Sequence, residues 1–202
     1  MTQAERTRRV TEGAGRLEAF SDAVMAVIIT ILAFQLRPPR GSSWADLREQ
    51  WASLLIYVLA FVFIAIYWNN HHHLLRATTR ISGAVMWANM LLLFCLSLAP
   101  VVTEWIRRIP SEALPVASFG VVSLAAAVSY TLLEQALLRA NERDSLLARA
   151  LAVRVKGYAS IAMYASAVAL AAVSVWVSYA LYAAVAVMWL VPDRRFTRAE
   201  VG

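Results

Sequence analysis

The sequence predicts an all-α integral membrane protein, and two observations carry this prediction. Of the 202 residues, 60% are hydrophobic and only 16% are charged, which is unlike the composition of a soluble domain. Long uncharged stretches also recur, each close to the roughly 20 residues that a helix needs to cross a bilayer. Six stretches are expected to span the membrane as helices: about 18–36, 52–72, 84–103, 115–138, 157–175 and 177–191.

These six stretches use most of the chain. We therefore expect residues 1–202 to form a single six-helix transmembrane unit without a separate soluble domain. The last two stretches are nearly continuous, and the only polar residues that weakly separate them are Ser174, Ser178 and Tyr179. Function must then be carried inside the helix bundle or by very short connections.

The distribution of positive charge predicts the orientation in the membrane. Fourteen of the 19 Lys and Arg residues lie in the N-terminus, in the connections after the second and fourth stretches, and in the C-terminus. Cytoplasmic segments carry such an excess, so both termini are expected in the cytoplasm. The same distribution accounts for the net charge of +6 without nucleic acid, for which no basic and aromatic motif is present. Five basic residues lie in the other connections: Arg37, Arg40, Arg48, Arg107 and Arg108.

The first stretch carries polar residues in its opening turns, where a simple anchor would have none. Arg16, a glutamate, Ser21 and Asp22 all precede or interrupt the apolar run. An acid within a membrane helix costs about 2.5–3.5 kcal/mol even on insertion scales. Because Asp22 is too short to reach the interface by extending its side chain, we expect it to have a polar partner and a role.

Polar side chains of the other stretches are predicted at the same depth, in the cytoplasmic third of the bundle. The second stretch ends, the third begins and the fourth ends with them: Trp68, Asn69, Asn70, His71, His72, Trp87, Asn89, Glu134 and Gln135. Polar groups in hydrocarbon need partners. We therefore expect Asp22 to pair with Asn or His side chains of the second stretch, with help from Arg16. The alternative for the histidines is a position at the membrane interface.

The run His71-His72-His73 has the residue type of a metal site but not its spacing. Adjacent helical residues point about 100° apart, whereas two ligands from one helix need i, i+4 spacing. A metal would require ligands from other helices, so hydrogen bonding is the favoured interpretation and no metal is predicted. The single cysteine, Cys95, is expected to be a small buried hydrophobe.

Helical geometry divides the first stretch into two faces. With Arg16 as the origin and about 100° per residue, one set of side chains falls within roughly 60° of a single line. This stripe consists of Arg16, Phe20, Ala23, Val27, Thr30, Ile31 and Phe34. It is basic at its cytoplasmic end and then apolar, with Thr30 as its single hydroxyl. Asp22 falls at about 240°, on another side. Ordinary lipid-facing or packing surface is the alternative interpretation of the stripe.

The pattern Arg16-x-x-x-Phe20-Ser21-Asp22, followed by the apolar run and Thr30-Ile31-Leu32, resembles the signature of the transmembrane protein 175 family. Six spans, cytoplasmic termini and a second span that ends in Trp, Asn and His extend the similarity over nearly the whole chain. That family contains lysosomal and bacterial potassium-permeable channels. The single copy of the motif is similar to the bacterial type, in which four six-helix subunits surround one pore.

The resemblance implies roles for individual residues. In the family, the first helix lines the ion path, and bulky apolar side chains form its constriction. The matching constriction position here is Val27, with Ile31 and Phe34 as further apolar pore positions and Thr30 in a layer linked to selectivity. Val27 is smaller than the Ile or Leu usual in the family, and Phe34 is larger than expected. Residues of the motif and of its helix-anchoring network are expected at Arg16, Phe20, Ser21, Asp22, Trp68, Asn69, Asn70, His71, His72 and Asn89.

The expected function is therefore a homotetrameric, potassium-permeable cation channel of the bacterial inner membrane. It would contact lipid and monovalent cations and would need no cofactor, no metal and no catalytic residue. Two alternatives stay open. One is a proton- or cation-coupled transporter with Asp22 and the histidines as a relay, and the other is a non-conducting structural membrane protein. A membrane enzyme is least favoured, because no nucleophile or ligand set accompanies Asp22.

Overall fold

The computed structural model describes residues 3–141 and 155–190, with side chains from Gly13 onward. Within these ranges the chain is helical and has no strand, which confirms the all-α prediction. The helices are α1 (Gln3–Phe34), α2 (Trp44–Glu49), α3 (Trp51–Arg76), α4 (Gly83–Ser97), α5 (Ala99–Arg108), α6 (Ala113–Ala140), α8 (Val155–Leu170) and α9 (Val175–Leu190).

Four helical segments are long and apolar enough to cross a membrane. They are Gly13–Phe34 in α1, Trp51–Arg76 in α3, Gly83–Arg108 in α4 with α5, and Ala113–Ala140 in α6. The 26 residues of α3 extend about 39 Å, which exceeds the hydrocarbon thickness of about 30 Å. Helices α8 and α9 have 16 residues each, and α9 is a shorter apolar helix.

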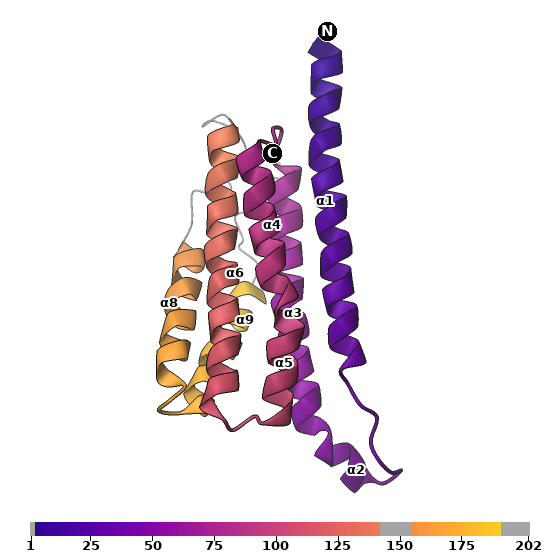
Figure 1. Ribbon diagram of the computed structural model, residues 1–202, viewed down its shortest axis with the longest axis vertical. Coiled ribbons are helices and arrows are strands. Elements are labelled where there is room, and N and C mark those ends of the chain that lie inside the picture. Colours follow the sequence, from indigo (N-terminus) through magenta and orange to yellow (C-terminus); the bar gives the residue numbers. More distant parts are fainter. Residues whose placement is uncertain (1–2, 142–154, 191–202) are drawn as a thin grey trace.

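The helices run side by side along the long axis of the molecule, and α1 stands at one edge (Figure 1). Helix α1 packs against α3, α4 and α5. Helix α6 packs against α4 on one side and α8 on the other, and α9 contacts α3, α6 and α8. Because α1 has neighbours on one side only, a large part of its surface stays uncovered within a single subunit.

Burial along the spans reflects this edge position. Only 28% of the most apolar window of α1 and 22% of that of α3 is buried, against 50% for the α4–α5 and α6 windows. The buried residues of α1 recur at intervals of three and four on the side that faces the other helices: Ala14, Leu17, Ser21, Met25, Ile28 and Leu32. The exposed remainder must be covered by lipid or by other subunits.

The third predicted span is a broken helix. Leu98 separates α4 from α5, and Pro100 occupies the first turn of α5. Proline has no N–H to donate, so the helical hydrogen-bond ladder is interrupted there. The carbonyl of Pro100 instead accepts a hydrogen bond from Gln35 Nε2 at 2.8 Å, which joins the end of α1 to the start of α5.

Two features near α1 differ from the predicted boundaries. Helix α1 begins at Gln3 rather than near residue 18, because the charged N-terminal residues continue the same helix. The connection after α1 contains the short helix α2, which was not expected. Ser43 caps α2 and forms a capping box with Asp46, and hydrogen bonds from Ser43 lower the pKa of the Asp46 carboxyl.

The nearly continuous last two stretches form a helical hairpin. The chain turns between Leu170 and Val175, where the N–H groups of Val173 and Ser174 both donate to the Leu170 carbonyl at 2.9 Å. Ser178 donates its hydroxyl to the carbonyl of Ala167 at 2.7 Å, close to the turn. Hydrogen bonds between α8 and α9 therefore stabilise two separate helices, although only a few polar residues separate the two stretches in the sequence.

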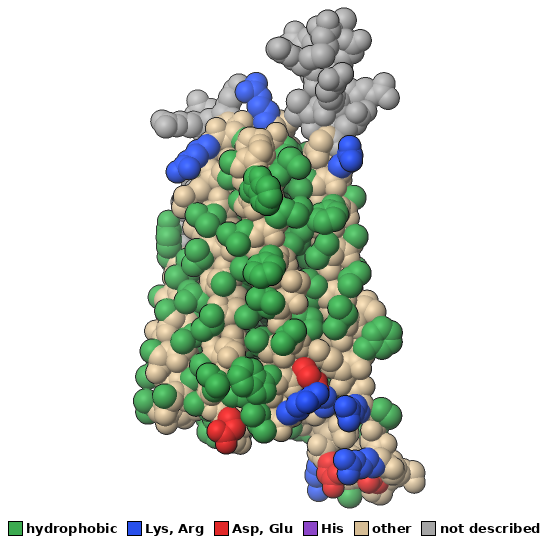
Figure 2. Space-filling view, in the orientation of Figure 1, with side chains coloured by type: hydrophobic (Ala, Val, Ile, Leu, Met, Phe, Trp, Pro, Cys, Tyr) green, Lys and Arg blue, Asp and Glu red, His purple; other side chains and the backbone are tan. Residues whose placement is uncertain are grey.

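Charged side chains lie at the two ends of the molecule and leave an apolar belt between them (Figure 2). On the face shown, the described charged side chains at one end are Lys and Arg, whereas those at the other end are of both signs. At the mixed end Glu104 pairs with Arg107 and with Arg108. An apolar belt between charged ends is the surface expected of a protein that crosses a bilayer.

Candidate pore helix and its polar anchor

The stripe predicted on α1 lies on the uncovered face of the helix. Val27 is 58% exposed, Ile31 44% and Phe34 83%. Phe20 at 49% continues the stripe toward the N-terminus, and Arg16 is also exposed. These side chains lie about 120° around the helix from the buried residues. The apolar stripe therefore does not pack in the core of its own subunit.

Beyond Phe20 along α1, Thr30 carries the only hydroxyl of this exposed face. Its Oγ1 donates a hydrogen bond to the carbonyl of Ala26, one turn earlier, at 2.8 Å. The hydroxyl proton is thereby directed back along the helix, and the oxygen lone pairs are left as acceptors. A side chain in this state can accept from water or coordinate a cation without losing a hydrogen bond.

A buried chain of polar side chains joins three helices on the opposite side of α1. His71 Nε2 of α3 lies 2.7 Å from Asn89 Oδ1 of α4, and Asn89 Nδ2 donates to Ser21 Oγ of α1 at 2.9 Å. Ser21 completes the chain by donating to the carbonyl of Leu17 at 2.8 Å. All three side chains are fully buried. Since each donor meets an acceptor, this network can lie within an apolar bundle.

The direction of donation assigns the His71 tautomer. Asn89 uses its amide nitrogen toward Ser21, so its oxygen accepts the proton of His71 Nε2. The other ring nitrogen, His71 Nδ1, is buried and has no hydrogen-bond partner. A neutral ring with its proton on Nε2 fits this arrangement.

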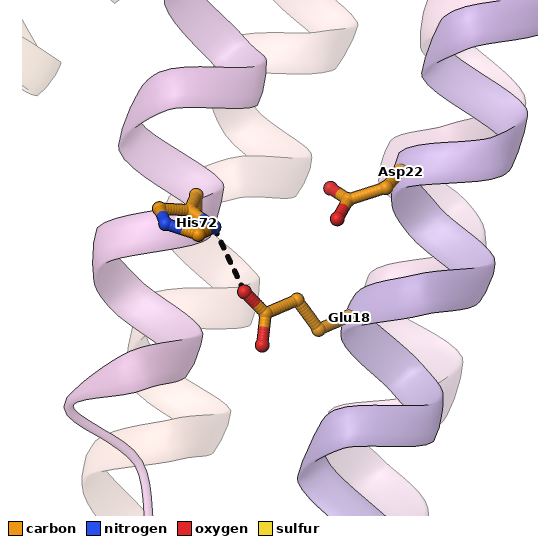
Figure 3. Close-up of side chains that lie close together, drawn as sticks. All are labelled: Glu18, Asp22 and His72. Carbon is orange, nitrogen blue, oxygen red and sulfur yellow. Dashed lines mark ion pairs between the residues drawn. The ribbon is translucent and has the colours of Figure 1, made fainter.

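Asp22 and Glu18 form a second polar group between α1 and α3 (Figure 3). Trp68 Nε1 donates to Asp22 Oδ1 at 3.0 Å, and His72 Nδ1 lies 2.8 Å from Glu18 Oε1. The prediction that Asp22 pairs with an Asn or His side chain is wrong, because its hydrogen-bond donor is Trp68. Trp68 and His72 are four residues apart and share one face of α3, and Glu18 and Asp22 share one face of α1 in the same way. Each of the two α3 side chains therefore meets one α1 carboxylate.

Not every predicted residue joins these two groups. Asn70 Nδ2 donates to the carbonyl of Ile66 in its own helix at 2.7 Å. Asn69 is exposed, and Trp87 is 78% exposed on α4. The prediction of one polar layer is thus too broad, since the side chains divide between a buried network, a half-exposed cluster and the outer surface.

Two residues that connect the helices were given no role by the sequence analysis, which noted the glutamate of the first stretch without a partner and did not single out Asn141. Glu18 is four residues before Asp22, and this i, i+4 spacing was a usable signal for a shared face. Asn141 closes α6, and its Oδ1 accepts hydrogen bonds from Thr79 N at 3.1 Å, Thr79 Oγ1 at 2.9 Å and Arg80 N at 3.0 Å. Nothing local in the sequence indicates that Asn141 holds the connection between α3 and α4.

A cavity of about 70 Å³ lies away from α1, between α3, α6, α8 and α9. Aromatic side chains form much of its wall, and polar groups of Asn70, Thr131, Glu134 and Ser160 also reach it. The predicted ion path was assigned to α1, so this cavity belongs to a different part of the subunit.

Comparison with known proteins gives one consistent family. The family profile described as endosomal/lysosomal potassium channel TMEM175 matches residues 16–100. A potassium channel of Chryseobacterium sp. is 41% identical over 185 residues, which cover 92% of this chain and 96% of the relative. A potassium channel of Streptomyces collinus is 32% identical over 153 residues, covering 69% of this chain and 74% of the relative.

A solved structure has the same fold. It is the crystal structure of a lysosomal potassium-selective channel TMEM175 homologue from Chamaesiphon minutus. The two structures superpose with a TM-score of 0.78 at 24% sequence identity, over 89% of this chain and 97% of the other. With one relative that matches almost end to end and helices that can cross a bilayer several times, the chain belongs to the TMEM175 family of multi-pass membrane proteins.

Proposed function

We propose that this protein is the subunit of a potassium-permeable cation channel. The relatives that it matches over most of their length are named potassium channels, and 41% identity over 185 residues is the strongest of these matches described above. No step of the proposed activity requires a catalytic residue or a cofactor. The permeant ion is the small partner of this activity, and nucleic acid has no part in it.

The observation that carries the mechanism is the exposed apolar stripe on α1. Val27, Ile31 and Phe34 are large apolar side chains that project from the uncovered face of their own subunit. When several copies of α1 surround an axis, such side chains make a ring narrow and dry enough to stop ions. The ring opens when the helices tilt or rotate and water enters. Thr30 adds hydroxyl oxygens to this path, which favour a weakly hydrated monovalent cation.

We take the assembly to be a homotetramer with α1 next to the axis. We propose six spans per subunit, namely α1, α3, the pair α4–α5, α6, α8 and α9, with both termini in the cytoplasm of a bacterial inner membrane. On the face shown in Figure 2, the described charged side chains are of both signs at one end and basic at the other, which supports this orientation. In this arrangement, the buried chain through Ser21 keeps α1 at a fixed rotation, so that its stripe faces the axis.

Planar-bilayer recording of the purified full-length protein tests the gate. Val27→Asn places a polar side chain in the proposed ring, which favours a wetted pore, so single-channel conductance or open probability should rise. Val128→Asn is the matched control, because Val128 is 41% exposed on α6 and lies outside the stripe. Unchanged currents in Val27→Asn would contradict the assignment of Val27.

The same recordings separate the channel from its two rivals. Discrete current steps support a channel, whereas saturable and stoichiometric exchange without steps supports a transporter. Liposomes without potassium, sodium or proton flux would support a structural membrane protein. Particle symmetry in detergent tests the assembly, since a four-fold particle with α1 on its periphery would overturn the proposed pore.

A further inference from the structure

Three metal-ligating side chains face one another between α1 and α3, away from the stripe of the proposed pore. Glu18 and Asp22 come from α1 and His72 from α3, and all three point into the space between the two helices (Figure 3). One donor atom from each, two carboxylate oxygens and a ring nitrogen, lie within 4.8 Å of one another. The proposed channel mechanism does not use this cluster.

An ordinary ion pair does not fully account for the geometry at His72. Its Nδ1 atom lies 2.8 Å from Glu18 Oε1, which is an ion-pair distance. That nitrogen is nevertheless buried and has no hydrogen-bond partner. A ring nitrogen that faces two carboxylates without a hydrogen bond is placed as a ligand would be.

Neighbouring groups hold two of these side chains in orientation. Trp68 donates its indole N–H to Asp22 Oδ1 at 3.0 Å. The indole also stacks on the His72 ring, with centroids 5.7 Å apart and planes at 21°. Asp22 has a second carboxylate oxygen, so it can bind a cation without breaking the bond from Trp68. Such supporting contacts are typical around protein metal ligands.

Only His72 of the three consecutive histidines meets ligands from another helix. His71 is used in the buried network with Asn89, and His73 is exposed. Adjacent helical residues point about 100° apart, so the three rings cannot share one ion. The packing of α3 against α1 therefore brings two carboxylate ligands next to His72, which the histidine run by itself does not have.

We propose that Glu18, Asp22 and His72 bind a divalent transition-metal ion of the Zn²⁺ class. One imidazole and two carboxylates suit Zn²⁺, which accepts three protein ligands and a water, at about 2.0–2.2 Å from nitrogen and oxygen. Ca²⁺ and Mg²⁺ require more oxygen ligands than this cluster offers. Two carboxylates balance the charge of the ion, and Glu18 and His72 are each 23% exposed, so the cluster lies close to the surface of the subunit.

Zn²⁺ at this site joins α1 to α3 through both helices' side chains. Any effect of this bridge on conduction depends on the proposed function, because α1 carries the proposed gate. A bridging ion restricts tilting or rotation of α1, so Zn²⁺ lowers potassium flux. The binding itself does not depend on whether the protein conducts potassium.

Calorimetric titration of Zn²⁺ into chelator-treated, full-length protein without a histidine tag tests the site. Wild type should bind one Zn²⁺ per subunit, and Glu18→Gln and His72→Gln should each weaken binding by at least about tenfold. His73→Gln is the matched control and should bind as wild type does, because His73 lies outside the cluster. Size-exclusion profiles and thermal unfolding midpoints check that each variant is folded. If His72→Gln does not fold, the more conservative Glu18→Gln decides alone.

The proposal is overturned if wild type binds no Zn²⁺, or if Glu18→Gln binds it as tightly as wild type. A flux assay in liposomes gives the second readout: Zn²⁺ should slow potassium efflux in wild type and His73→Gln but not in Glu18→Gln. Potassium flux without Zn²⁺ binding would defeat only the metal site. Zn²⁺ binding without potassium flux would defeat only the proposed function.

Discussion

Individual side chains explain why α1 keeps one rotation in the bundle. The hydrogen bonds run from His71 of α3 through Asn89 of α4 to Ser21, and they end at the Leu17 carbonyl of α1. Each link has a donor and an acceptor, so rotating α1 would leave buried polar groups without partners. Such groups cost about 1–3 kcal/mol each. The exposed stripe is thereby turned away from the core.

Replacement of Ser21 tests whether the hydrogen-bond network stabilises the position of α1. Ser21→Ala removes the acceptor of Asn89 Nδ2, and hydrogen bonds between membrane helices contribute about 0.6 kcal/mol on average and at most about 1.7. We expect a lower thermal unfolding midpoint in detergent. Ser118→Ala is the control, because Ser118 only donates to Leu114 in its own helix. Equal shifts in the two variants would argue against the network.

Replacement of Thr30 tests the proposed selectivity layer. Thr30→Val keeps the shape of the side chain and removes the oxygen that can accept from water or a cation. The potassium-to-sodium permeability ratio should fall toward one, measured as the reversal potential under bi-ionic conditions. Thr131→Val on α6 is the control, because its hydroxyl also donates to its own helix, at Ala127. A ratio unchanged by Thr30→Val would exclude Thr30 from the selectivity layer.

Close packing between helices depends on one glycine of α6. A Cβ atom at Gly120 would lie 2.7 Å from Val168 Cγ2 of α8 and would also meet the Tyr182 hydroxyl of α9. Tyr182 donates that hydroxyl to the carbonyl of Val116 at 2.8 Å, and its ring packs on Phe119 at 5.1 Å. The α8–α9 hairpin therefore reaches α6 at a position where only glycine leaves room.

The two glycines on facing helices make a matched pair. Gly120→Ala forces Val168 and Tyr182 to move, and overpacking of this kind costs about 1–3 kcal/mol. Gly157→Ala on α8 meets no atom within 4 Å and should be neutral or stabilising by up to about 1 kcal/mol. Thermal unfolding of both variants measures the difference. A Gly120→Ala variant as stable as wild type would show that the hairpin adapts.

Prediction of the elements succeeded where it depended on local composition. Runs of apolar residues identified the regions of α1, α3, α4–α5 and α6, and the helices have these positions to within several residues. The break at Leu98 was missed, although Pro100 was a local signal for it. Helix α2 was also missed, because Ser43 and Asp46 act as a cap over only six helical residues.

At the scale of the whole molecule, the face shown in Figure 2 has an apolar belt between a basic end and an end with both charge signs among the described residues, and this predicts the orientation in the membrane. In spheroplasts, a membrane-impermeant maleimide should label Ser42→Cys, which is exposed between α1 and α2. Gly83→Cys at the start of α4 should be labelled only after permeabilisation, and its new side chain meets no atom within 4 Å. Native Cys95 is buried and adds little background. The reverse pattern would place the termini outside.

The sequence by itself determined the helical membrane class, the approximate positions of the four long apolar helical segments and the two-faced character of α1. Each of these depends on hydropathy and on the fixed angle between neighbouring residues of a helix, which are local properties. Only the tertiary structure decided the partners: Trp68 for Asp22, and Glu18 for His72. Such pairs depend on the rotation and the axial register of α1 against α3. Packing of the whole bundle sets both, so no local pattern in either helix contains them.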